Sequence, residues 1–178
     1  MSIPAKHKKG APKDISVAII VVSDSRYEES ISGKKTSDES TPVMVQLLTE
    51  SGHRIESVEY VPDSKEHILK MVDRLLNAPV SVIITTGGTG LAPRDVTVES
   101  IEPLLKKRIP GFGELLRQIS FKEIGAATML TRAIAGIIDE TVVFCLPGSP
   151  NAVRIALTKL IIPEISHIIK HLKEKQIS

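Results

Sequence analysis

Two strand-like segments, residues 15–22 and 80–86, restrict the fold of this chain more than any other feature. The first is a run of β-branched and aliphatic residues, which is typical of a strand buried on both faces of a parallel sheet, and the second is predicted as a further strand that leads directly into a glycine loop. A shorter strand pattern at 55–61 and a helical stripe at 68–76 lie between them. Because strands joined through single helices cannot pair as tight hairpins, we predict a three-layer α/β/α fold with a mostly parallel sheet.

Turn and capping residues divide the first half of the chain further. Residues 26–40 are rich in Ser, Gly, Lys and Glu without an apolar period, so we expect a long loop there. Thr41-Pro42 offers an N-cap and a first-turn proline for the next helix, and Gly52 offers its end.

The second half is predicted to add helices and a small hairpin. Thr97 is expected to cap a short helix, although Pro103 favours a start near Glu102. Pro110-Gly111 is expected to break the chain before the next helix. The predicted hairpin at the sheet edge joins 133–138 to 141–146 through Asp139-Glu140, Asn151 is expected to cap a helix, and Pro163 to interrupt or kink it.

Composition excludes several classes of protein. The single Cys145 can form neither an intramolecular disulfide nor a four-thiolate zinc site, and we expect it to be a buried apolar residue. No apolar run approaches the roughly 20 residues that span a bilayer, so we predict a cytoplasmic protein without membrane contact. His167 and His171 lie one helical turn apart but lack a third ligand nearby, which favours solvated helix residues over a metal site.

Positive charge is concentrated at the N-terminus. Four of the 23 basic residues fall in the first 13 positions, and the other 19 face 21 acidic residues. With 3% aromatic residues and no Trp, the chain lacks the stacking residues of a nucleic-acid-binding protein. We therefore predict a flexible basic leader at 1–13, a single domain at 14–178 and no nucleic-acid partner.

Four polar loops follow predicted strands or precede helices, and they are the candidate site. In an open parallel sheet, ligands bind beyond the carboxyl ends of the strands, where such loops converge. The loops are Ser23-Asp24-Ser25, Pro62-Asp63, the stretch from Gly87 to Asp95, and Pro147-Gly148-Ser149-Pro150.

The glycine loop is predicted to bind phosphate. Gly87, Gly88 and Gly90 lack β-carbons, so their N–H groups can approach an anion closely, although a turn that needs positive φ angles explains them equally. Neither a Walker A lysine nor the third glycine of a dinucleotide fingerprint is present. Arg94 and Asp95 place a cation and a Mg²⁺-binding carboxylate beside the loop; a surface ion pair is the alternative.

Five ordered motifs resemble the molybdenum-cofactor biosynthesis family, which includes MogA, MoaB and the G domain of gephyrin. The resemblance covers 15–169 and is strongest to the MoaB branch. The motifs are Thr85-Thr86-Gly87-Gly88-Thr89-Gly90, Pro93-Arg94-Asp95-Val96-Thr97, Pro110-Gly111-Phe112-Gly113-Glu114, Arg132-Ala133-x-Ala135-Gly136 and Leu146-Pro147-Gly148-Ser149-Pro150.

The resemblance implies an enzyme that adenylylates molybdopterin with Mg-ATP and releases pyrophosphate. Asp95 and Asp63 fall on carboxylates that active members need, and we assign Asp95 to the metal and Asp63 to positioning. Neither needs to act as a base, because a phosphate monoester is already anionic near neutral pH.

The same resemblance assigns further ligand contacts. Thr131 stands where the family usually has Ser, and Ser149 where Asn is common. The implied binding residues are Ser23, Asp24, Ser25, Asp38, Ser40, Gly87, Gly88, Thr89, Gly90, Arg94, Thr131, Arg132, Pro147, Gly148, Ser149 and Pro150.

Two other functions compete with this interpretation. One is a molybdopterin-binding paralogue or assembly scaffold without catalysis, and the other is an unrelated nucleotide binder, which the missing fingerprint disfavours. The resemblance also implies a homo-oligomer, and the sequence does not distinguish a trimer from a hexamer or molybdenum from tungsten in the final cofactor.

Overall fold

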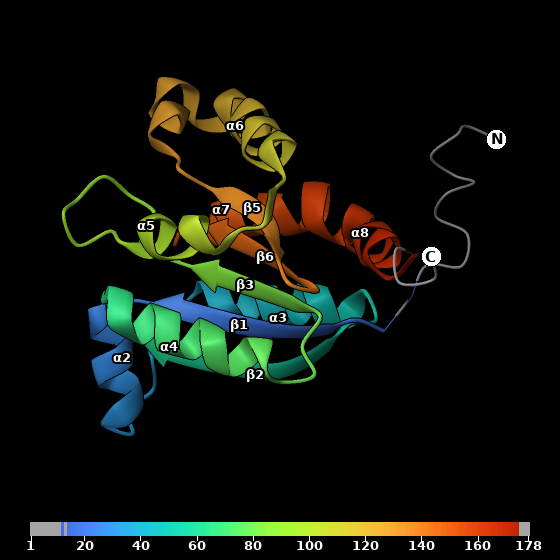
Figure 1. The fold of residues 1–178 in the computed structure, drawn as a ribbon. Coiled ribbons are helices and arrows are strands. Elements are labelled where there is room, and N and C mark those ends of the chain that lie inside the picture. The colour runs from blue at the N-terminus through green and yellow to red at the C-terminus, as the bar shows by residue number, and fades with distance from the viewer. Residues whose placement is uncertain (1–11, 13, 175–178) are drawn as a thin grey trace.

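Within residues 12 and 14–174, which the computed structural model describes, six strands form one sheet in the order β2-β1-β3-β6-β5-β4 (Figure 1). The predicted leader at 1–13 therefore lies, Pro12 apart, outside the described residues. The strands are β1 (Ser16–Val22), β2 (Arg54–Val61), β3 (Val82–Thr86), β4 (Lys107–Arg108), β5 (Ile134–Ile138) and β6 (Thr141–Leu146).

The four strands β2, β1, β3 and β6 are parallel, and β5 and β4 complete the sheet in antiparallel orientation. The mostly parallel sheet and the β5–β6 hairpin confirm the predicted fold class. The hairpin is less peripheral than expected, because β6 pairs with β3 inside the sheet and the short β4 takes the edge.

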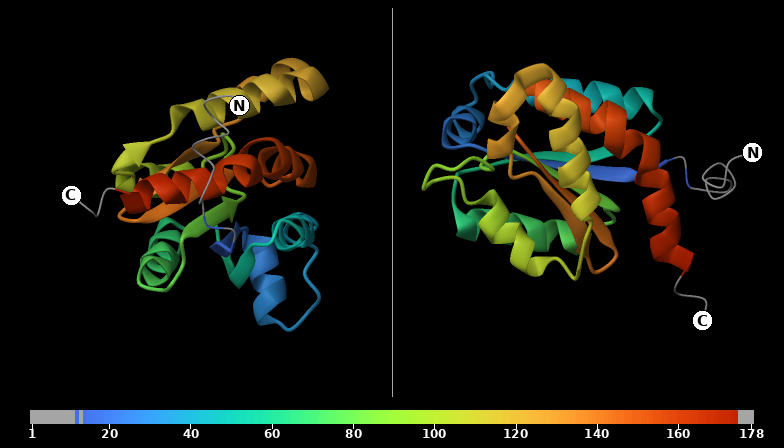
Figure 2. Two further views of the ribbon diagram at one scale, coloured as in Figure 1. Left: turned by 90° about the vertical axis from the view of Figure 1, so that its right-hand side faces the viewer. Right: turned by 90° about the horizontal axis from the view of Figure 1, so that it is seen from above.

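Helices cover both faces of the sheet (Figure 2). Within the described residues they are α2 (Asp24–Ile31), α3 (Ser40–Glu50), α4 (Lys65–Leu76), α5 (Thr97–Ile101), η1 (Glu102–Leu104), α6 (Pro110–Ile124), η2 (Gly125–Leu130), α7 (Pro150–Ile155), η3 (Ala156–Ile161) and α8 (Ile162–Glu174). None of these helices is long and apolar enough to cross a membrane.

The continuous apolar run of β1 serves two separate cores. Val17, Ile19 and Val21 pack with the buried side chains of α3, α6, α7, η3 and α8 on one face of the sheet. The intervening side chains, such as Ile20, pack with α4 and α5 on the other face. Because successive side chains of a strand point to opposite faces, a strand covered on both sides has no polar positions.

The sheet reverses its strand order between β1 and β3. From β1 the chain passes to β2 on one side, and after α4 it crosses to β3 on the other. Such a switch point leaves a crevice beyond the carboxyl ends of the two strands, which is where open α/β sheets bind ligands. Val22 and Thr86 end these strands, and the serine and glycine loops follow them.

Three helix boundaries differ from the expected ones. Residues 24–31, predicted as loop, form the helix α2, none of whose side chains is buried. Thr97 does not cap α5; it is the first residue of that helix, which ends at Ile101 before a 3₁₀ turn that accommodates Pro103, so the predicted start near Glu102 is wrong. Pro110 begins α6 instead of breaking the chain, because a proline at the first turn loses no helical hydrogen bond.

The C-terminal helix is continuous but changes its pitch. The α-helical α7 passes into a π-helical segment, η3, and returns to α-helix in α8, one residue before Pro163. A proline cannot donate the hydrogen bond of a helix interior, and a wider turn before it relieves that defect. The expected interruption is therefore a local change in winding.

Candidate functional site

Asp24 and Asp63 join the first two polar loops. The backbone N–H of Asp24 donates to Asp63 Oδ2 at 3.1 Å, and the N–H of Asp63 donates to Asp24 Oδ1 at 2.9 Å. Ser23 N–H also donates to the last residue of β2, Val61, at 2.9 Å. The ends of β1 and β2 are thus held together by two carboxylates, each through one of its two oxygens.

The glycine loop leaves no room for side chains. A β-carbon at Gly87 would lie 2.3 Å from Val22 O, and one at Gly88 would lie 2.3 Å from Thr97 Oγ1 and 3.3 Å from Asp63 Oδ1. Both residues also have positive φ angles, 93° and 60°. Glycine is required here for conformation and for the close approach of Val22 and Thr97, so the turn explanation applies, while phosphate binding by the loop stays a prediction.

Asp95 closes the same loop. Its Oδ2 accepts a hydrogen bond of 2.8 Å from the N–H of Ala92, and a β-carbon at Gly90 would lie 2.6 Å from this oxygen. The other oxygen, Oδ1, has no hydrogen bond within the described part of the chain, so it is available to a ligand.

One cavity of about 320 Å³ brings these groups together. Asp24, Asp63 and Asp95 line it with Arg94 and Gly88. Burial raises the pKa of Asp63 above its usual value; the Asp24 N–H and Arg94 oppose this rise, while the carboxylates of Asp24 and Asp95 add to it. A bound cation would relieve this accumulation of negative charge.

A second cavity of about 180 Å³ adjoins the first. It is lined by Asp38, Ser40, Thr86, Gly87 and Gly148. Val22, Ser23 and Arg26 line both cavities, so Arg26 is the charged side chain common to their walls. Arg26 was not predicted as a site residue, because it fell in a segment predicted to be a long loop. Its position directly after Ser23-Asp24-Ser25 could have indicated a role at the site.

Asp38 and Ser40 have structural contacts at this second cavity. Asp38 Oδ1 accepts from the N–H groups of Ser40 and Thr41 at 2.9 and 3.1 Å, so it caps α3 in place of the predicted Thr41. Its Oδ2 accepts from the Tyr60 hydroxyl at 3.3 Å. Ser40 Oγ donates to Gly148 O at 2.7 Å and ties α3 to the loop after β6.

The loop after β6 lies against the glycine loop. Thr86 Oγ1 donates to Pro147 O at 3.1 Å, and a β-carbon on Gly148 would lie 3.5 Å from the Cα of Gly87. Ser149 Oγ accepts from Ala152 N–H at 3.3 Å and caps α7, whose first residue is Pro150. The predicted cap Asn151 is therefore wrong, and serine at 149 performs a task for which asparagine is equally suited.

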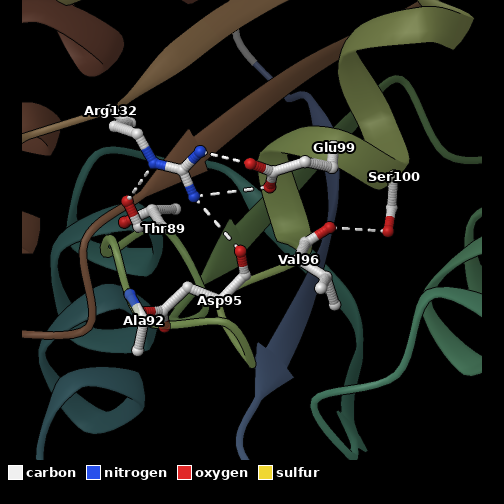
Figure 3. A network of polar contacts seen from close by, with 7 residues as sticks. All are labelled: Thr89, Ala92, Asp95, Val96, Glu99, Ser100 and Arg132. Carbon is white, nitrogen blue, oxygen red and sulfur yellow. Dashed lines mark hydrogen bonds and ion pairs between the residues drawn. The ribbon is translucent and has the colours of Figure 1, made fainter.

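Thr131 and Arg132, which are predicted ligand contacts, line neither of the two cavities. Thr131 is half-buried just before β5, and its carbonyl accepts from Arg117 at 3.4 Å. The guanidinium of Arg132 binds Glu99 of α5 and the backbone of the glycine loop (Figure 3). Glu99 was missed because its partner is 33 residues away in the sequence.

The donor set of the larger cavity fits magnesium. Among the residues that the structure describes, no three histidine, cysteine or acidic side chains are grouped to hold a metal ion by themselves. Mg²⁺ usually takes only one or two protein carboxylates and completes its shell with waters and substrate phosphates. The Oδ1 atoms of Asp63 and Asp95, which lie beside the glycine loop, are such a partial set.

Fold and site together define a class: an α/β domain with polar cavities at a sheet switch point, which is where open α/β sheets bind ligands. Comparison with known proteins then gives the family. The family described as "Probable molybdopterin binding domain" matches residues 18–167. The chain therefore belongs to the molybdenum cofactor biosynthesis family, as the motifs predicted.

Individual relatives agree with this assignment. The chain is 47% identical to molybdenum cofactor biosynthesis protein B of Bacillus cereus over 165 residues, which is 92% of this chain and 94% of the relative. It is 40% identical to the probable molybdopterin adenylyltransferase of Methanocaldococcus jannaschii over 163 residues, 91% and 96% of the two chains. The crystal structure of the tungsten cofactor synthesizing protein MoaB from Pyrococcus furiosus superposes with a TM-score of 0.80 at 41% identity, covering 92% of this chain and 99% of the other.

Proposed function

We propose that this protein adenylylates molybdopterin. In the reaction, an oxygen of the terminal phosphate of molybdopterin bonds to the α-phosphorus of ATP, the bond to the β-phosphate breaks, and pyrophosphate leaves. The observation that carries the proposal is the single cavity in which Asp63 and Asp95 face Arg94 and the glycine loop. The name of the Methanocaldococcus relative supports the same reaction.

The residues of the larger cavity suit the triphosphate and its cation. Magnesium, when bound, neutralises phosphate charge that develops as the bond to pyrophosphate breaks. Asp95 and Asp63 would hold the magnesium ion through their Oδ1 atoms. Asp24 fixes Asp63 through the paired hydrogen bonds. Arg94 supplies a further positive charge at the cavity.

The second cavity gives the other substrate a place beside the first. A transfer reaction needs both phosphates at a common wall, and Val22, Ser23 and Arg26 form such a wall. Arg26 is held by hydrogen bonds of 3.3 Å to Ser25 Oγ and 3.4 Å to Ser37 O. In this position its charge can help align the reacting groups, which is the principal contribution of proteins to phosphoryl transfer.

The direct test is pyrophosphate release from Mg-ATP in the presence of molybdopterin. We expect the unmodified protein to release pyrophosphate. In Asp95→Asn we expect turnover to fall by about 100-fold or more, because the metal loses a charged ligand. Molybdopterin binding should persist in that variant. The matched control is Asp139→Asn in the β5–β6 turn, whose carboxylate pairs with Lys106 and should leave turnover unchanged.

The outcomes separate the candidate functions. Molybdopterin binding without pyrophosphate release would reject the enzyme in favour of a binding paralogue or scaffold. Full turnover in Asp95→Asn would reject the role of that carboxylate. Binding of nucleotide without molybdopterin would reject the family function altogether.

We also propose that the chain forms a homo-oligomer, a trimer or hexamer, in the cytoplasm. Helix α6 and η2 expose large apolar side chains around a mostly apolar cavity of about 420 Å³. An exposed apolar patch of this kind usually marks a protein interface, and we assign it to a second copy of the chain. Light scattering of Phe121→Glu and Met129→Glu should show smaller particles; unchanged assembly in both would exclude this surface.

A further inference from the structure

Arg132 connects three segments that are distant in the sequence. Its Nε donates to the carbonyl of Thr89 in the glycine loop at 3.2 Å, and its Nη2 donates to the carbonyl of Asp95 at 3.2 Å. Nη1 and Nη2 bind the carboxylate of Glu99 on α5, the latter at 3.3 Å (Figure 3). One side chain next to β5 therefore holds both ends of the loop 89–95 and the helix that follows it.

This arrangement uses most of the hydrogen-bonding capacity of the arginine. A guanidinium carries five N–H groups in a fixed plane, and the four contacts engage four of them. The Arg132 side chain is also only 27% exposed. Arg94, in contrast, lines the larger cavity. The two arginines are therefore placed for different tasks, one within the protein and one toward the ligand.

Packing holds only the beginning of this loop. Thr89 is buried, whereas residues 91–94 are all exposed. Thr97 binds the beginning of the loop, with N–H to Gly88 O at 3.0 Å and Oγ1 to Gly87 O at 2.9 Å. Beyond Gly88, the Asp95–Ala92 bond is internal to the loop, so it fixes the local turn but not the position of Asp95 in the molecule.

We propose that Arg132 is a positioning residue for the adenylyl transfer: with Glu99 it fixes the loop 89–95 so that the Asp95 carboxylate lies in the cavity. It acts through the loop and does not contact a substrate. The effect of this tether on catalysis rests on the proposed function. The tether itself can be measured in the ligand-free protein. The hydrogen bonds from Arg132 also lower the pKa of Glu99, so this carboxylate stays ionised near neutral pH.

The test uses variants that keep the charge or the shape of each partner. Arg132→Lys keeps the charge but loses the planar fork, and Glu99→Gln keeps the shape but loses the charge. The matched controls are Arg108→Lys and Glu102→Gln, an exposed ion pair of 3.1 Å on η1 and β4. Hydrogen exchange of the amides at 88–97, kcat, KM for ATP and the Kd for molybdopterin are measured for each variant and for the double variant of each pair.

We expect faster exchange at 88–97 in Arg132→Lys and Glu99→Gln, and a fall in kcat of about 10- to 100-fold, as for other residues that orient a catalytic ligand. The Kd for molybdopterin should stay within about twofold. The fall in kcat in the double variant should be no larger than in the more impaired single variant, because both substitutions break the same tether. The control pair should change none of these quantities.

Two results would overturn the proposal. Unchanged exchange with weaker molybdopterin binding in Arg132→Lys would make Arg132 a ligand contact. Additive losses in the double variant would mean that the two residues act separately. If the unmodified protein releases no pyrophosphate, the proposed function fails, while exchange in the ligand-free protein still decides whether the tether exists.

Discussion

The two ends of the sheet differ in what their cavities bring together. At the amino end of β3 and β6, a cavity of about 370 Å³ is lined largely by apolar and small residues, among them Val80, Ser81 and Ile169. At the carboxyl end, a cavity of about 320 Å³ brings together three carboxylates and two arginines. Of these two cavities the one at the amino end has the larger volume, so volume does not identify the candidate site; the convergence of charged side chains does.

The two ends of the sheet also differ in how their carboxylates are paired. In the turn that leads into β6, Asp139 pairs with Lys106 on the surface, which is the ordinary arrangement of opposite charges. At the carboxyl end, burial raises the pKa of Asp63, and the carboxylates of Asp24 and Asp95 add to this rise. Functional sites often retain such unfavourable charge because a ligand compensates it.

Gly88→Ala tests whether the carboxyl end depends on close backbone approach. Gly33 provides the control, since its φ of 69° resembles the 60° of Gly88 but a β-carbon there would meet no atom within 4 Å. We expect Gly88→Ala to lower the free energy of unfolding by about 1–3 kcal/mol more than Gly33→Ala, because the new methyl overlaps Thr97. Urea unfolding measures the difference, and equal effects would contradict the clash.

Ser149 tests whether the same end also depends on helix capping. Ser149→Ala removes the oxygen that accepts from Ala152, and we expect a loss of about 1 kcal/mol in the free energy of unfolding. Ser149→Asn should stay within a few tenths of a kcal/mol of the unmodified protein. Chemical unfolding checks both values; an asparagine variant as unstable as the alanine variant would show that capping is not the reason.

The smallest effect concerns the charge of Asp63. Because its pKa is raised in the folded protein, ionisation of Asp63 opposes folding at neutral pH. Asp63→Asn keeps an oxygen for the Asp24 N–H, so we expect a slightly higher Tm at pH 7 without added metal. This advantage should disappear as the pH falls below about 4, where the carboxyl is protonated in both states.

Asp139→Asn is the control for that experiment at the other end of the molecule. It removes an ion pair with Lys106, so its Tm should not rise at any pH. Saturating Mg²⁺ should stabilise the unmodified protein more than Asp63→Asn, since binding to the folded state raises its stability. A lower Tm for Asp63→Asn at pH 7 would contradict the assigned direction of the pKa shift.

The strands and their order of appearance could be predicted because burial on both faces leaves a strong local signal. The helix α2 could not, because none of its residues is buried and its sequence lacks an apolar stripe. The capping residues were also missed. Asp38 and Ser149 cap α3 and α7 in place of Thr41 and Asn151; several polar residues stand near each helix start, and only the backbone path selects one.

The sequence by itself determined the alternation of strands and helices, the glycine loop at 87–90 and the family motifs, because all of these are local patterns. The tertiary structure decided which side chains meet. Asp24 and Asp63 are 39 residues apart, and Arg132 and Asp95 are 37 apart. Such contacts depend on the register of β1, β2 and β3 and on the path of the loops, which no local pattern encodes. Thus Arg132, predicted as a ligand contact, is found bound to the loop that carries Asp95, the candidate metal ligand.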